Sequence, residues 1–202
     1  MGQGLPSSAQ LRRLSGGMIL LTAGQTLLAQ GHAFVMAQRP LDWSHWLLLL
    51  GAVTLTWRLT EIPVGWLGRL GRLVTVAGGA AFIGMSVIDF SLWGLPSEAA
   101  REAFTSRVLQ APTISLPFLS VGPSLLFVGL GAMVLEWVAA MRWRVGVLGG
   151  IVLVGVGQFG NARWLVVGGH LVILAGLGAM WLQVRWREGH SLGMNGGRRD
   201  SK

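Results

Sequence analysis

Residues 164–186 read WLVVGGHLVILAGLGAMWLQVRW, an apolar run with a tryptophan at each end. Only His170, Gln183 and Arg185 carry strongly polar side chains in this stretch. A helix needs about 20 consecutive apolar residues to cross the hydrocarbon core of a bilayer, and tryptophan is enriched at both membrane interfaces. The run therefore predicts a transmembrane helix over 164–186.

Five further apolar runs precede this one and determine the expected fold class. The predicted spans cover residues 14–37, 43–57, 73–93, 123–141, 145–160 and 164–186. The chain of 202 residues is 52% hydrophobic, contains 31 glycines and is only 12% charged. This charged share is about half of that in a soluble domain. We therefore expect an all-α integral membrane protein, a bundle of six transmembrane helices with short interfacial helices.

The basic residues are distributed unevenly between the two ends of the predicted spans. With the N-terminus in the cytoplasm, 12 of the 16 lysines and arginines lie on the inner side and 4 on the outer side. The positive-inside rule then places both termini in the cytoplasm. The net charge of +8 indicates attraction to an anionic inner leaflet and not to nucleic acid. We expect a multi-pass protein of the bacterial cytoplasmic (inner) membrane.

The segments outside the spans differ in composition. Residues 1–13 are predicted to form a cytoplasmic tail. Residues 187–202 are predicted to form a disordered basic cytoplasmic tail, because they contain glycine and arginine without apolar periodicity. Leucines and arginines on opposite faces over 65–73 predict an inner interfacial helix, and residues 96–110 predict an outer amphipathic helix. Prolines before residue 123 indicate that the fourth span is broken or entered at an angle.

Three reactive side-chain types are absent from the predicted membrane spans. The sequence contains no cysteine and no tyrosine, and its only lysine is Lys202. Disulfide exchange, thiolate metal sites and a Schiff base inside the membrane are therefore excluded as activities of this chain. The remaining chemistry belongs to His, Asp, Glu, Gln, Asn and Arg.

Three titratable side chains are predicted at a similar depth in the membrane. His32, Asp89 and His170 each lie about five or six residues from the outer end of a different span, about 8–10 Å below the outer boundary. Ionisable residues at membrane depth are costly and are functional candidates by default. We therefore expect a shared pocket that opens to the outer side.

Further polar residues extend this predicted pocket. Gln25 lies seven residues before His32 and shares its helix face. His45 lies near the outer mouth of the second span, and Gln158 lies at the outer end of the fifth. Segment 96–110 is expected to cap the pocket. The predicted ligand-binding set is Gln25, His32, His45, Asp89, Gln158 and His170.

The same set permits different chemistries. An enzyme would use Asp89, His32 and His170 as its acid and base, with Asp89 fixing a histidine tautomer or accepting a proton. Two histidines from different helices can also ligate a haem iron or, with Asp89, a divalent metal, although no two histidines share a helix or a known spacing. No dedicated metal site is predicted, and the cofactor stays open. Alternatively, each histidine is satisfied by a carbonyl or headgroup water, and Asp89 by the interface or Arg163.

Glu136 is a separate candidate near the inner end of the fourth span. Arg58 is predicted at the same level of the membrane. A structural ion pair between Glu136 and Arg58 is therefore the expected role, because it would fix the inner helix ends.

These features predict a protein that binds a small lipophilic ligand in an outer-leaflet polar pocket. It would act as a carrier or as an accessory subunit of a larger membrane complex. Two alternatives stay open. One is an intramembrane enzyme acting on a lipid-soluble substrate of the isoprenoid or polyketide type, and the other is a purely structural membrane subunit. The expected partners are the lipid bilayer, the small molecule and other membrane subunits.

A reporter fused after Lys202 tests the predicted orientation. Six spans and the uneven distribution of basic residues place this end in the cytoplasm. We expect a green fluorescent protein fusion to fluoresce and an alkaline phosphatase fusion to be inactive. An active phosphatase fusion would contradict the predicted topology and, with it, the outer location of the pocket.

Overall fold

The computed structural model describes residues 6–38, 41–62, 64–137 and 141–196, with side chains over the same ranges except 141–142 and 191–196. Every regular element in these residues is helical and none is a strand, which confirms the all-α prediction. The helices are α1 (Ser8–Ala29), α2 (His32–Ala37), α3 (Trp43–Thr60), α4 (Trp66–Trp93), α5 (Glu98–Gln110), α6 (Pro112–Ile114), the π-helix η1 (Ser115–Ser120), α7 (Gly122–Glu136), α8 (Met141–Phe159) and α9 (Arg163–Gly196).

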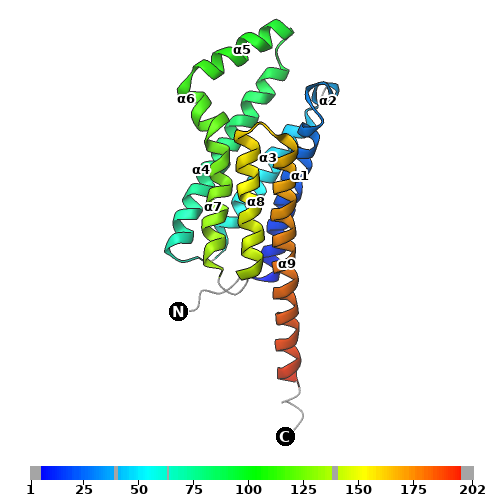
Figure 1. The fold of residues 1–202 in the computed structure, drawn as a ribbon, viewed down its shortest axis with the longest axis vertical. Coiled ribbons are helices and arrows are strands. Elements are labelled where there is room, and N and C mark those ends of the chain that lie inside the picture. Colours follow the sequence, from blue (N-terminus) through cyan, green and yellow to red (C-terminus); the bar gives the residue numbers. More distant parts are fainter. Residues whose placement is uncertain (1–5, 39–40, 63, 138–140, 197–202) are drawn as a thin grey trace.

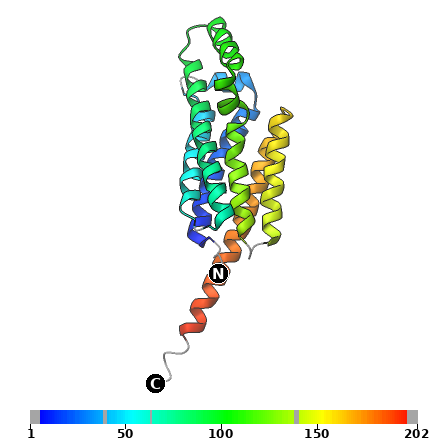
Figure 2. The same cartoon turned by 90° about the vertical axis from the view of Figure 1, so that its left-hand side faces the viewer.

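The long helices of the chain stand side by side (Figure 1), and their packing order closes into a ring. Each packs against the next in the order α1, α3, α4, α7, α8 and α9, and α9 packs against α1. Buried apolar side chains from all six helices fill the ring, among them Met18, Leu55, Phe82, Leu130, Val147 and Leu177. The short elements α2, α5 and α6 lie together at one end of the ring (Figures 1 and 2). We call this the lid end.

The opposite end of the ring holds the beginning of α1 and the late part of α9. Ser8 Oγ donates a hydrogen bond to Glu188 Oε2 at 2.6 Å, which ties these two helices together. We call this the basic end, because several arginines lie here, near the first or last turns of the helices. These are Arg12, Arg13, Arg58, Arg69, Arg72, Arg185 and Arg187.

Local side chains determine where several helices begin. Ser7 and Gln10 form a capping box at the start of α1. Ser7 Oγ accepts a hydrogen bond from the backbone N–H of Gln10 at 3.2 Å, and Gln10 Oε1 accepts one from the backbone N–H of Ser7 at 2.9 Å. Asp42 caps α3 and Ser97 caps α5 through side-chain oxygens. Gly31 has a φ of +99°, in the left-handed region that favours glycine, and separates α1 from α2.

Glycines allow neighbouring ring helices to approach closely. A Cβ atom at Gly78 of α4 would overlap the backbone nitrogen of Leu126 in α7. Gly150 and Gly169 have the same role between α8 and α9, where a Cβ on either glycine would lie 2.7 Å from the other's carbonyl oxygen. Close contact through small residues is a common way for helices to associate in lipid.

Two described helices are long and apolar enough to cross a membrane, namely α4 and the Arg163–His190 part of α9. Pro112–Ser120 and Gly122–Glu136 add a third span if this pair, bent by 42°, is counted as one. The bend lies where the sequence predicts a broken entry to the fourth span. By length and composition, the structure therefore supports two or three membrane-spanning helices.

The first and third predicted spans differ from the observed helices. The first, 14–37, is interrupted because the backbone turns at Gly31, and α1 ends at Ala29. The prediction of a separate interfacial helix over 65–73 is wrong, because α4 runs without a break from Trp66 to Trp93. In this first part of α4, glycines pack against α7, so it belongs to the ring.

The fourth span and the two predicted tails also differ. α7 ends at Glu136 and α8 begins at Met141, so the predicted span 123–141 is too long. The N-terminal tail predicted over 1–13 contains the start of α1. Helix α9 continues to Gly196, where the sequence predicts a disordered tail from residue 187. Residues 1–5 and 197–202 lie outside the described residues.

Replacement of Gly78 by alanine tests the close contact of α4 with α7. The new methyl group would meet main-chain atoms that have no flexible end to move, so we expect a loss of about 1–3 kcal/mol of stability. The matched control is Gly149→Ala, because a Cβ at Gly149 meets nothing within 4 Å. Thermal unfolding of the two variants in detergent measures the difference. Equal stability would contradict the close packing of α4 against α7.

Candidate functional site

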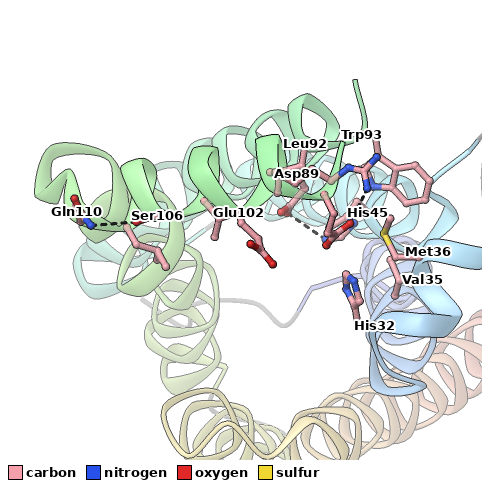
Figure 3. A pocket seen from close by; sticks show the side chains of 14 residues that line it. His32, Val35, Met36, His45, Asp89, Leu92, Trp93, Glu102, Ser106 and Gln110 are labelled. Carbon is pink, nitrogen blue, oxygen red and sulfur yellow. Dashed lines mark hydrogen bonds and ion pairs between the residues drawn. The ribbon is translucent and has the colours of Figure 1, made fainter. Parts of the chain in front are cut away.

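A cavity of about 650 Å³ lies at the lid end, bounded by α2, α3, α4 and α5 (Figure 3). This volume is in the range of small-molecule binding sites in proteins. One part of the wall is apolar and includes Val35, Met36, Leu92 and Leu109. The other part brings together charged and hydrogen-bonding side chains, which is the usual composition of a ligand site.

Each wall of the cavity comes from a helix whose position follows from a local feature. The turn at Gly31 redirects the chain, so that α2 carries His32 over the end of the ring. The last turns of α4 supply Asp89 and Trp93. Helix α5 begins at the Ser97 cap and covers the cavity with one of its faces. The outer helix predicted over 96–110 is thus present as α5, and it lines the cavity.

A chain of two carboxylates and one imidazole connects α3 to α4 within this site. Asp42 Oδ1 accepts from the backbone N–H of His45 at 3.1 Å, and its Oδ2 lies 2.5 Å from His45 Nδ1. On the other side of the imidazole, His45 Nε2 lies 3.2 Å from Asp89 Oδ2. Both imidazole nitrogens of His45 therefore face a carboxylate oxygen.

Burial makes these contacts necessary for the carboxylates. The side chain of Asp42 is only 2% exposed, whereas that of Asp89 is 23% exposed and borders the cavity. Burial works to raise the pKa of Asp42, but hydrogen bonds from His45 and its positive charge outweigh burial and hold this pKa below its usual value. Asp42 also accepts a hydrogen bond from the side chain of Trp93, so both α3 and α4 hold it in place.

Helix α5 contributes a second set of charges. Arg101 Nη1 donates to Glu98 Oε2 at 2.9 Å, and Arg101 Nη2 donates to the carbonyl oxygen of Leu95 at 3.1 Å. The bond to Leu95 fastens α5 to the connection after α4. Glu102 lies one residue further on, and its carboxylate extends into the space shared with His32 and His45 (Figure 3).

The structure brings together three of the residues that the sequence predicts for this site. His32, His45 and Asp89 line the cavity from α2, α3 and α4. His32 occupies the first turn of a separate helix and does not lie on the α1 face of Gln25. Gln25 is half-buried on α1 and is not part of the cavity wall.

His170 and Gln158 lie elsewhere, so their predicted place in the pocket is wrong. His170 is buried inside the ring of helices. Its Nδ1 lies 2.8 Å from the carbonyl oxygen of Val166, and its imidazole packs edge-on against the Phe127 side chain, with 5.1 Å between the ring centroids. Gln158 accepts a hydrogen bond from Ser124 at 3.3 Å. Similar depth along the helices did not place His170 near Asp89, because its side chain faces α7.

The predicted ion pair between Glu136 and Arg58 is also not formed. Arg58 pairs with Glu61, three residues away on the same chain segment, at 2.9 Å. Glu136 Oε2 instead accepts from the backbone N–H of Gly65 at 2.7 Å, at the start of α4. A carboxylate at a helix N-terminus satisfies an otherwise unpaired amide and suits the helix dipole.

Three residues of the site were not predicted from the sequence: Asp42, Arg101 and Glu102. A signal for Asp42 is present, because an aspartate just ahead of an apolar helix and three residues before His45 matches an N-cap. Arg101 and Glu102 belong to the predicted outer helix, but its weak amphipathicity does not indicate which face turns towards the ring.

The described residues contain no group of three or more His, Cys, Asp or Glu side chains arranged to hold a metal ion. The predicted pair of His32 and His170 for a haem iron is not formed, because only His32 lines the cavity. Acid–base chemistry is still within reach of the Asp42–His45–Asp89 chain, since a proton between carboxylate and imidazole can move to a bound molecule.

Comparison of the chain with protein family models, with curated proteins and with solved structures gives no match. The chemical interpretation of the cavity therefore rests on its own residues and their geometry.

A double-variant cycle tests whether His45 and Asp89 interact as the structure shows. We expect His45→Ala and Asp89→Ala to be non-additive, with a coupling of about 1–3 kcal/mol in unfolding free energy, because each variant removes the same bond. His170→Ala combined with Asp89→Ala is the control and should be additive within about 0.5 kcal/mol. Additivity of the first pair would contradict the contact, and coupling of the control pair would return His170 to the site.

Proposed function

We propose that this protein is a multi-pass membrane protein that binds a small lipophilic ligand in the cavity at the lid end. All six ring helices would cross the bilayer, with both termini in the cytoplasm. The apolar α4 and α9 support membrane insertion, and α3, one of the shorter ring helices, has 18 residues. At 1.5 Å per residue it is about 27 Å long, close to the thickness of the hydrocarbon core.

The distribution of charge supports this orientation. The arginines of the basic end lie opposite the cavity, which matches a cytoplasmic surface under the positive-inside rule. The lid end carries Arg101, Arg107 and Arg163, far fewer basic residues. The cavity then opens at the outer leaflet of a bacterial cytoplasmic membrane, with the anionic inner leaflet at the opposite end.

The observation that carries the proposed function is the cavity itself. About 650 Å³ of space is bordered both by aliphatic side chains and by a hydrogen-bonded Asp–His–Asp chain. A ligand with an apolar body and one polar head would satisfy both kinds of wall. Such a protein acts as a carrier or as an accessory subunit that presents the ligand to a larger membrane complex.

An intramembrane enzyme is the second candidate, and one contact favours it. His45 is held between Asp42 and Asp89, and Asp89 reaches the cavity, so a proton could pass between the chain and a lipid-soluble substrate. Substrates of the isoprenoid or polyketide type fit the apolar wall. A purely structural subunit would have no use for this open space.

Replacement of Leu92 by tryptophan tests the ligand-binding proposal. The larger side chain would occupy part of the cavity, so a bound molecule should be lost on native purification in mild detergent. Leu135→Trp is the control, because Leu135 is 43% exposed and does not line the cavity. Mass spectrometry of extracts should show a small molecule with wild type and control and not with Leu92→Trp. Identical extracts from all three would contradict the proposal.

The same extracts separate a binding protein from an enzyme. A single molecule would favour a carrier or an accessory subunit. Two isomers that differ in the position of a hydrogen atom, with their ratio changed in Asp89→Asn, would favour the enzyme.

A further inference from the structure

The wall of the cavity carries more negative than positive side chains. Its charged residues are three carboxylates and one guanidinium: Asp89, Glu98, Glu102 and Arg101. Arg101 is already engaged by Glu98 at 2.9 Å and by the carbonyl oxygen of Leu95 at 3.1 Å. The charges of Arg101 and Glu98 therefore compensate each other, although Arg101 Nε is buried without a hydrogen-bond partner among the described residues.

The Asp42–His45–Asp89 chain carries one negative charge when it holds one proton in each of its two hydrogen bonds. An imidazolium between two carboxylates leaves one negative charge on the chain. A neutral imidazole between one carboxylate and one carboxylic acid leaves the same charge. Loss of a further proton only adds a second negative charge. The chain is neutral only with one proton more, as an imidazolium beside a carboxylic acid that accepts through its carbonyl oxygen.

Glu102 adds another negative charge, from α5. Its side chain makes no hydrogen bond or ion pair with any part of the chain that the structure describes, and it extends towards the cavity from α5 (Figure 3). The cavity therefore has the carboxylates of Asp89 and Glu102 in its wall, from α4 and α5, and neither charge is balanced by Arg101. Hydroxyl and aliphatic side chains also line the cavity.

We propose that the cavity selects amphiphilic amines, with a protonated amine head near Asp89 and Glu102 and an aliphatic or aromatic body against Val35, Met36 and Leu92. This inference rests on the proposed function. An ammonium group supplies both the positive charge and the hydrogen-bond donors that carboxylates require. A neutral head would leave the negative charge at the partly buried Asp89 without a partner beside an apolar wall, and an anionic head would add a like charge there, which costs free energy.

A bare metal cation matches this wall less well than an organic cation. Metal ligands must converge on one point at about 2.0–2.6 Å. Among the described residues, no three His, Cys, Asp or Glu side chains converge in this way. A metal ion would also leave the aliphatic wall without a partner, whereas the hydrocarbon part of an amine covers it.

Three probes of one chain length test the inference: octylamine, 1-octanol and octanoate. The full chain is placed in phosphatidylcholine nanodiscs at pH 7, and binding heats are measured by titration calorimetry after subtraction of empty nanodiscs. We expect saturable octylamine binding at least about tenfold tighter than that of 1-octanol, because charge-assisted hydrogen bonds add to the same apolar contact. Octanoate should show no saturable binding.

Variants of Glu102 assign the preference to the cavity. Glu102 is exposed on α5 and makes no side-chain bond in the described structure, so its replacement should leave the fold intact. Glu102→Gln should weaken octylamine about tenfold and leave 1-octanol unchanged. Glu61→Gln is the matched control, because Glu61 pairs with Arg58 at the basic end, and it should change neither affinity. Glu102→Arg should favour octanoate over octylamine.

The outcomes separate the amine inference from the proposed function. Equal saturable binding of octylamine and 1-octanol would overturn the amine preference and leave a lipophilic pocket. Absence of saturable binding by all three probes would contradict the pocket as well. An octylamine preference that persists unchanged in Glu102→Gln and Glu102→Arg would overturn the assignment to this wall.

Discussion

The imidazole of His45 lies between the carboxylates of Asp42 and Asp89, and this contact organises the lid end of the molecule. Asp42 starts α3, and Asp89 lies in the last turns of α4, so the contact sets how these two helices meet. Two carboxylates this close would repel each other without a donor between them. One imidazole satisfies both carboxylates, and Asp89 also borders the cavity.

The ring and the cavity have opposite physical requirements. Below the lid end, glycines such as Gly78 and Gly150 bring helix backbones into direct contact, and buried aliphatic side chains leave little space. At the lid end, α5 buries only Val108 among its residues, and Arg101 donates a hydrogen bond to the carbonyl oxygen of Leu95. The ring is therefore densely packed, whereas its lid end contains the cavity.

The sequence predicts the helical class and several helix starts because apolar runs and caps are local signals. Trp43 begins α3 as predicted, and the broken approach to α7 follows from its prolines. The partner of a polar residue depends on helix rotation, which depth along a span does not give. For this reason His170 faces the interior of the helix ring and not the cavity, and Glu136 binds the backbone N–H of Gly65 and not Arg58. The sequence indicates Asp42 as a helix cap, but it does not indicate the second contact of Asp42, with the imidazole of His45.

Solid-state NMR in lipid bilayers tests the central contact most directly, because the sequence holds only four histidines and three aspartates. With ¹⁵N-labelled histidine and ¹³C-labelled aspartate carboxyl groups, dipolar recoupling reports which imidazole nitrogens lie beside which carboxylates. The structure predicts one histidine whose two ring nitrogens couple to two different aspartates, with one coupling lost in Asp89→Asn. Spectra in which no histidine couples to two aspartates would contradict the Asp42–His45–Asp89 chain and the cavity built on it.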